Sequence, residues 1–335
     1  MPQVSVSDAK WGIPRWSSKG RYMAVSTLWD AHGYKEQTDI YDGRTLAKIY
    51  TLPISYAQFA FAPDENSLAA TSYKADLHNI SLPEMQKLLV QNNGGNFENI
   101  KWSPDSKYFC NRPLDAMQIY TAKKLQISIP IGHRSFASQL AWHPHLHRLA
   151  LRHSIPPQND TSGIKVMDID GTLLYEATHP GLCGDVAWSA CGKYLAYITD
   201  TDLTLLDGTT FKELARLPLE AGIKPVYRNI CWSPNWPQLF VQTGPAKIGL
   251  YDASLKDWVY NLDHDLEGDC RLRFCPDGVK LLMIARHQMM AIDAGTKEKI
   301  YAMSSEKPMY AAQWLDEKTV GIRGIGYASL VAIAG

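Results

Sequence analysis

The chain has 335 residues, and its 34 Lys and Arg balance 34 Asp and Glu, so the formal net charge is zero at pH 7. This balance argues against general binding to nucleic acid or to an anionic membrane, since both need an excess of positive charge. No apolar stretch approaches the ~20 residues of a membrane-spanning helix. The beginning, MPQVSVSDAKWG, lacks the basic and apolar regions of a secretion signal. We therefore expect a cytoplasmic protein without a membrane or nucleic-acid partner.

An aromatic residue recurs at intervals of 40 to 46 residues along the whole chain. Each one ends a short apolar run and is usually followed by a polar turn and a second apolar run. Repeats of this length are typical of the four-stranded blades of a β-propeller. They predict an all-β fold, with one propeller domain of eight blades over residues 1–335; seven blades, with one degenerate repeat, is the alternative. The anchors are Trp16, Phe61, Trp102, Trp142, Trp188, Trp232, Phe274 and Trp314.

The fifth repeat shows how one repeat maps onto four strands. Apolar residues alternate around Trp188, which is typical of a half-buried strand. Ala190-Cys191-Gly192 then provides a tight turn into a second strand, and Asp207-Gly208 separates a third strand from a fourth. The predicted strands cover residues 185–189, 193–199, 203–206 and 213–218.

Several short motifs recur around the anchors. Ser103-Pro104-Asp105 and Pro276-Asp277-Gly278 follow their anchors, and Gly132-His133 precedes Trp142 by nine residues. These motifs resemble the WD-repeat family over nearly the whole chain. The resemblance implies a propeller that binds partners on the face reached by the ends of its second strands. The family's Trp-Asp dipeptide is replaced by Tyr41-Asp42, Met167-Asp168, Leu206-Asp207, Tyr251-Asp252 and Ile292-Asp293.

The eighth repeat lacks a fourth strand. After Trp314 the sequence provides a second strand near residues 319–323 and a third near 329–334. A strand-like run over residues 2–7 precedes the first anchor and belongs to no other repeat. Because an open edge strand promotes aggregation, we expect residues 2–7 to form the outer strand of the last blade and so to close the propeller.

Three features could suggest metal binding, and we expect none of them to bind a metal. The histidines of the fourth repeat fall largely at turn positions, where other repeats have Ser or Asp, although zinc is the alternative. Asp168-Ile169-Asp170-Gly171 lacks the other oxygen ligands of a calcium loop, and favours a turn. The six cysteines show no C-x-x-C spacing, so we expect buried thiols. The histidines are His133, His143, His145, His147 and His153.

The ends of the second strands provide the candidate binding residues. Several carry cations that could bind an acidic segment or a phosphate, or could be separate surface charges. Residues 26–37 and 153–163 are expected to be long loops on the same face, and exposed aromatic residues commonly anchor interfaces. The candidates are Trp29, His32, Tyr34, Phe97, Arg112, Arg152, Tyr227, Arg228, Arg286 and Arg323.

These features predict a non-catalytic scaffold that binds a protein or peptide through this loop face, as part of a hetero-complex. The sequence has no nucleophile elbow and no phosphate-binding loop, and we expect neither catalysis nor a cofactor. Two alternatives stay open: an enzyme or small-molecule binder that uses the mouth of the central channel, and a structural subunit of a larger assembly.

Overall fold

The computed structural model contains eight four-stranded antiparallel sheets, which are the blades of an eight-bladed β-propeller. The prediction of eight blades is therefore confirmed, and the alternative of seven is wrong. The chain divides into two compact units, Met1–Pro130 with Lys307–Gly335, and Ile131–Glu306. The structure describes residues 3–4, 14–30, 33–72, 76–92, 98–112, 116–130, 140–154, 161–220, 229–268, 270–324 and 327–333.

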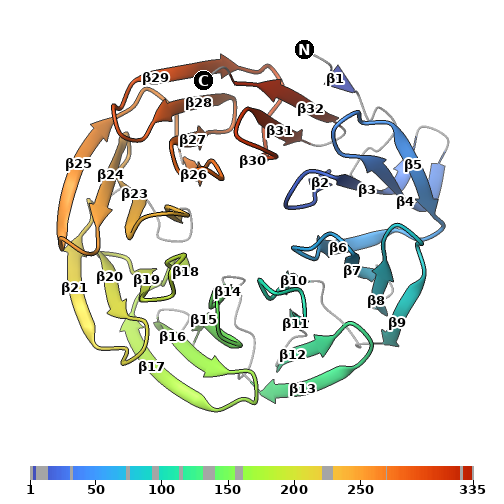
Figure 1. Ribbon diagram of the computed structural model, residues 1–335, viewed down its shortest axis with the longest axis horizontal. Coiled ribbons are helices and arrows are strands. Elements are labelled where there is room, and N and C mark those ends of the chain that lie inside the picture. Colours follow the sequence, from blue (N-terminus) through green and yellow to red (C-terminus); the bar gives the residue numbers. More distant parts are fainter. Residues whose placement is uncertain are drawn as a thin grey trace. The chain divides into compact units, whose positions relative to one another are not determined.

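The first unit contains the first, second, third and eighth sheets, numbered in chain order (Figure 1). The first three are β2 (Arg15–Trp16), β3 (Tyr22–Asp30), β4 (Gly33–Asp42) and β5 (Lys48–Leu52); β6 (Tyr56–Phe61), β7 (Ser67–Ser72), β8 (Asp76–Ser81) and β9 (Lys87–Asn92); and β10 (Glu98–Trp102), β11 (Tyr108–Arg112), β12 (Ala116–Thr121) and β13 (Leu125–Pro130). The eighth sheet contains β30 (Ala311–Trp314), β31 (Thr319–Gly324), β32 (Tyr327–Ala332) and β1 (Gln3–Val4).

The second unit contains the fourth to seventh sheets, each built from four consecutive strands. The fourth and fifth are β14 (Leu140–Trp142), β15 (Arg148–Ser154), β16 (Thr161–Asp168) and β17 (Leu173–Pro180), then β18 (Val186–Trp188), β19 (Tyr194–Ile198), β20 (Asp202–Asp207) and β21 (Glu213–Pro218). The sixth and seventh are β22 (Ile230–Trp232), β23 (Gln238–Gly244), β24 (Lys247–Asp252) and β25 (Asp257–Asp263), then β26 (Arg271–Phe274), β27 (Lys280–Ile284), β28 (Gln288–Asp293) and β29 (Lys299–Ser304).

Each of the eight anchors is the last residue of the first strand of its sheet, as predicted. Two of the tryptophan anchors, one in each unit, bond to the preceding sheet of their own unit. The indole N–H of Trp102 donates to the carbonyl of Ala60 at 2.9 Å, and that of Trp232 donates to Ala187 at 3.1 Å. Both bonds join the first strands of neighbouring sheets, so the anchors hold adjacent blades together.

Apolar side chains fill the space between neighbouring sheets within each unit. One cluster contains Phe109 and Trp102 of the third sheet together with Leu77 of the second. Another joins Val241 of the sixth sheet to Ile198 of the fifth. Because burial of a large apolar side chain contributes about 1.5–3 kcal/mol, these layers supply most of the stability of each unit.

The N-terminal strand completes the eighth sheet, as predicted. Strand β1 pairs antiparallel with β32, with Gln3 opposite Ser329 and Val4 opposite Ala328. It lies at the outer edge of this sheet, whose inner strand is β30 (Figure 1). The strand from the beginning of the chain therefore covers an edge that would otherwise be open.

The expected loop over residues 26–37 is instead a strand hairpin. Strand β3 continues to Asp30 and β4 begins at Gly33, with Trp29 paired opposite Tyr34. Thr, Trp and Tyr favour extended backbone, so the hydrogen-bonded ladder continues beyond the point where other sheets turn. The second expected loop, over residues 153–163, is partly replaced by the ends of β15 and β16, and its residues 155–160 lie outside the described part.

Deletion of residues 1–8 tests the role of β1. We expect the truncated protein to melt at a lower temperature, by about 2–4 °C for each kcal/mol of lost pairing, because the edge of β32 becomes exposed. Thermal unfolding followed by circular dichroism measures this shift. A truncated protein that melts like the intact protein would contradict the closure.

Candidate functional site

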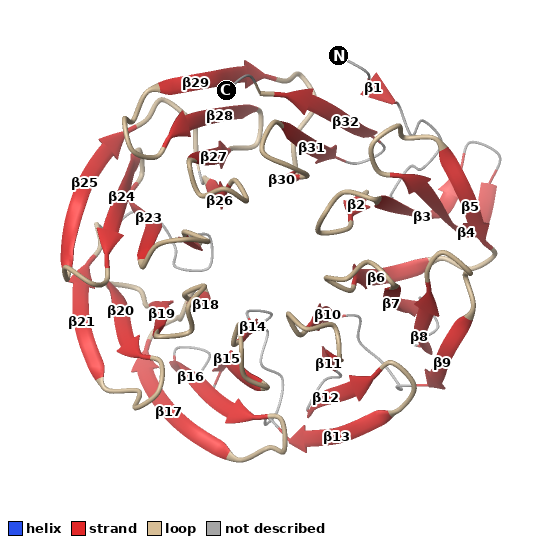
Figure 2. Cartoon of the chain, viewed as in Figure 1, coloured by secondary structure: helices blue, strands red, loops and turns tan. Residues whose placement is uncertain are grey.

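In each antiparallel sheet, successive connections alternate between the two ends of the strands. Figure 2 shows the turns and loops in tan. One side carries the turns between the first and second strands and between the third and fourth, and we call it the turn face. The other carries the connection between the second and third strands and the link to the next sheet, and we call it the loop face. From the sequence, we predict that the candidate binding residues lie on the loop face.

Most of these candidates have side chains outside the part that the structure describes. His32, Phe97, Tyr227 and Arg228 lie outside the described residues altogether. Trp29, Tyr34 and Arg112 are placed only as members of their strands, with Arg112 opposite Glu98 at the end of β11. The role of these residues in partner binding stays a prediction.

Arg152 is buried, with 8% of its surface exposed. Its Nη1 donates a hydrogen bond to the carbonyl of Cys183, which lies in the link between the fourth and fifth sheets. Burial lowers the pKa of the guanidinium, and Cys183 and Asp185 partly offset this effect. Arg152 therefore holds the link against β15 and offers little surface to a partner.

The other two candidate arginines whose side chains are described differ in exposure. Arg323 in β31 is half-buried, and its Nη1 donates to the carbonyl of Pro14 at 3.1 Å. Arg286 is exposed on the loop face, between β27 and β28. Of these three arginines, Arg286 alone presents its charge openly, which leaves the expected recognition of an acidic segment with little support from the described residues.

His143 organises a turn, as its sequence position predicts. Its Nδ1 accepts hydrogen bonds from the backbone N–H groups of His145, at 3.1 Å, and Leu146, at 3.0 Å. The hydroxyl of Ser233 accepts the equivalent pair in the sixth sheet, both at 3.3 Å. The imidazole also packs edge-on against Trp188, with 4.6 Å between the ring centres. His143 thus replaces the usual turn serine and adds a contact to the next sheet.

The segment 168–171 and the six cysteines are the other features that could suggest metal binding. Asp168 accepts a hydrogen bond from Arg148 Nε at 3.0 Å, and Asp170 accepts one from the backbone of Thr172 at 2.9 Å, which makes this segment a turn as expected. All six cysteines are free thiols; Cys191 is exposed and the others are buried. Among the described residues, no group of three or more His, Cys, Asp or Glu is placed to hold a metal ion.

The turn face of the second unit carries exposed apolar side chains. Trp236 is 64% exposed and Leu255 is 73% exposed. In the described part of this unit the loop face has one exposed large apolar residue, Leu182. The five on the turn face are Leu146, Leu173, Trp236, Leu255 and Val279.

Contacts between neighbouring sheets hold these turns in place. The side-chain amide of Asn235 donates to the carbonyl of Asp277, which joins the turns of the sixth and seventh sheets. Gly192 lies directly against the ring of His143, since a β-carbon there would be 2.5 Å from its Cε1. These contacts hold the turns between first and second strands against one another, a property that lowers the entropic cost of binding a partner.

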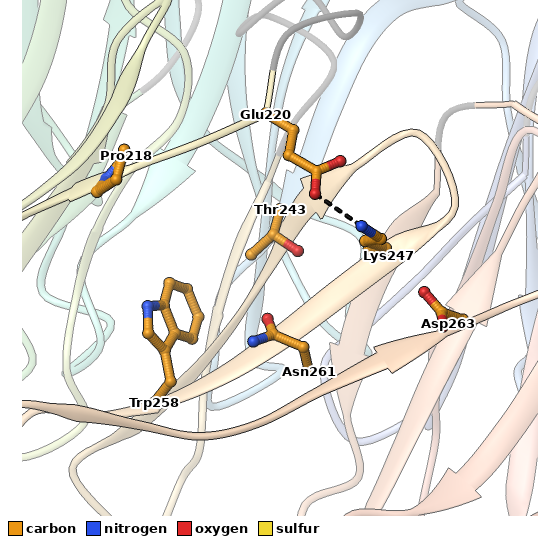
Figure 3. Close-up of a pocket in the computed structure, with 7 residues that line it drawn as sticks. All are labelled: Pro218, Glu220, Thr243, Lys247, Trp258, Asn261 and Asp263. Atoms are coloured by element: carbon orange, nitrogen blue, oxygen red, sulfur yellow. Dashed lines mark hydrogen bonds and ion pairs between the residues drawn. The ribbon is translucent and has the colours of Figure 1, made fainter.

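A polar pocket of about 360 Å³ lies between the fifth and sixth sheets (Figure 3). The end of the fifth sheet contributes Pro218 and Glu220, and the rest comes from β23, β24 and β25. Glu220 and Lys247 form an ion pair at 2.8 Å. The other lining residues are Thr243, Trp258, Asn261 and Asp263.

Two glycines leave room for side chains that line this pocket. A β-carbon on Gly249 would lie 2.3 Å from Trp258 Cζ3 and 2.8 Å from Asn261 Oδ1, so both side chains fold over the bare backbone of β24. A β-carbon on Gly244 would lie 2.4 Å from a carboxylate oxygen of Glu220. The repeat pattern gave no signal for this pocket, because its residues come from two repeats.

Comparisons with known proteins support the fold. No protein-family model matches the chain, and the search of curated proteins finds no match. Among solved structures, Chaetomium thermophilum Sqt1 bound to the N-terminus of the ribosomal protein L10 has 14% identity and a TM-score of 0.74, covering 97% of each chain. The computationally designed Ika8 protein has 11% identity and a TM-score of 0.75, covering 98% of each chain. A eukaryotic initiation factor has 17% identity and a TM-score of 0.65, covering 94% of this chain and 82% of its own.

At these identities the likeness shows a shared fold, and the resemblance to WD repeats stays a prediction. Within the described residues there is no helix with the length and apolar character that a membrane crossing requires.

The burial of His143 predicts that the stability of the folded protein depends on pH. Burial, with a smaller contribution from nearby Arg148, lowers the pKa of His143 to about 4. The unfolded chain takes up a proton near pH 6.5 while the folded protein does not, so stability falls as the pH falls from about 6.5 to 4, by up to ~3 kcal/mol. We expect His143→Ser, which keeps a turn acceptor, to reduce this loss in urea unfolding at pH 7 and pH 5. The exposed His145→Ser on the same turn is the control, and equal pH profiles for the wild type and both variants would contradict the assignment.

The close packing of Trp258 on Gly249 predicts that a larger residue at position 249 lowers the stability of the protein. We expect Gly249→Ala to cost about 1–3 kcal/mol and to displace Trp258, because the new methyl group overlaps the indole. Gly295→Ala is the matched control, since a β-carbon there has no atom nearer than 3.4 Å. Chemical unfolding of both variants makes the comparison, and similar stabilities would refute the close packing.

Proposed function

We propose that the protein is a non-catalytic scaffold, which binds a protein or peptide partner with the turn face of its second unit. The observation that carries the proposal is the exposed Trp236, together with the four other exposed apolar side chains of this face. Tryptophan is enriched among the residues that dominate binding energy, and exposed apolar groups gain most when a partner removes them from water.

The arrangement of the turns supports this proposal. The Ser233 hydroxyl holds the backbone N–H of Trp236, and Asn235 binds the neighbouring turn. A surface that is already ordered loses little conformational freedom on binding. A neighbour with the same fold, Sqt1, was solved bound to the N-terminus of a ribosomal protein, which is a precedent for binding a protein segment.

Two buried histidines with shifted pKa values have structural contacts, which is consistent with the proposed non-catalytic role. Burial lowers the pKa of His78, whose Nδ1 lies 2.8 Å from the hydroxyl of Tyr56. Burial also lowers the pKa of His143, which is occupied in its turn. Both histidines stabilise the packing of the strands around them. We infer that the protein forms a hetero-complex through its turn face.

Capture of partners from native lysate tests the proposal. Because Trp236 and Leu255 are exposed, Trp236→Glu with Leu255→Glu should leave the melting temperature nearly unchanged and abolish capture of partners that the wild type retains. Arg286→Glu, on the loop face, is the control and should retain them. Loss of the partners with Arg286→Glu alone would instead favour the loop face predicted from the sequence. Retention by both variants would refute the turn face.

A further inference from the structure

The pocket between the fifth and sixth sheets is separate from the turn face. It lies beside the connection between β23 and β24, which places it towards the loop face of the second unit. Its chemistry also differs, since its lining is mostly polar or charged. A ligand of this pocket would therefore be a second binding activity, independent of the partner of the turn face.

Trp258 provides an aromatic wall. One side of its ring lies over Gly249, and the ring packs edge-on against Tyr251 with 5.4 Å between ring centres. The side chain is half-buried and borders the pocket (Figure 3). An indole held in this way offers a π surface that attracts a cation.

The open polar groups of the pocket include a carboxylate and an amide oxygen, which are acceptors. Asp263 and Asn261 make no side-chain hydrogen bond with any residue in the described part of the chain. The Thr243 hydroxyl is buried and likewise has no partner among the described residues. A carboxylate and an amide oxygen beside an indole fit a ligand that supplies several N–H donors.

The net charge of the pocket also favours a cationic ligand. Two carboxylates, Glu220 and Asp263, face one ammonium, Lys247, so the pocket carries a net charge of −1. The hydrogen bond to Glu220 raises the pKa of Lys247, and Asp263 adds to this effect. Because Glu220 forms the ion pair with Lys247 at 2.8 Å, Asp263 is the carboxylate of the pocket that has no ion pair within the described residues.

From these observations we propose that the pocket binds the guanidinium of an arginine side chain in a peptide. Its planar group stacks on Trp258, and its N–H groups donate to the carboxylate of Asp263 and to Oδ1 of Asn261. Arginine fits better than lysine, because a planar fork of donors can stack and form two hydrogen bonds at once. An anionic ligand would meet a pocket with a net negative charge.

The indole N–H resonance of Trp258 reports on this binding in a two-dimensional NMR titration. Trp258→Phe identifies the resonance. N-acetyl-arginine amide should shift it in a saturable way, whereas N-acetyl-citrulline amide, which has nearly the same shape without the charge, should not. Equal shifts with both compounds, or an equal shift with glucose, would overturn the proposal.

Two variants of charged residues test whether the ligand is positively charged. Asp263→Asn should weaken binding of the arginine amide about tenfold, because a charged hydrogen-bond acceptor is lost. Lys247→Met should strengthen it roughly two- to fivefold, because a repelling charge is removed and Glu220 is released. Both residues are exposed, so the fold should be retained, and unchanged melting temperatures verify this. No weakening in Asp263→Asn, or weakening in Lys247→Met, would refute a cationic ligand.

Discussion

The packing of neighbouring four-stranded sheets within each unit is the interaction on which the rest of the structure depends. Each anchor aromatic ends the first strand of its blade, and Trp102 and Trp232 reach the preceding blade of their own unit through hydrogen bonds to Ala60 and Ala187. Apolar side chains continue the contact outward along the sheets. Because each sheet is fixed by its neighbours, short turns and a shallow pocket can keep defined positions without a core of their own.

Both candidate surfaces follow from this packing. Near the inner strands the turns are tied together, as Asn235 and Asp277 show, and apolar side chains such as Trp236 point outward from a fixed base. In the sixth sheet, Gly249 lets the side chain of Trp258 pack directly over the backbone of β24. One surface is apolar and exposed, and the other is concave and negatively charged, so they suit different ligands.

The sequence predicted what depends on local pattern and spacing. The eight blades, the strands of the fifth repeat, the pairing of the N-terminal strand and the turn role of His143 all follow from the register of the anchors. It could not predict the burial of Arg152, because its partner Cys183 belongs to a link between repeats. The strand hairpin at Trp29 and Tyr34 also departs from the repeat, since extra residues there continue the ladder. The pocket was missed because neither of its two repeats is unusual by itself.

Hydrogen–deuterium exchange of the protein, alone and with its captured partner, tests whether the turn face binds that partner. We expect the partner to slow exchange in the turns around residues 233–237 and 275–279, while the loop-face connection at 285–288 exchanges as before. Protection confined to 285–288 and other loop-face segments, with no change in the turns, would rule out binding through the turn face.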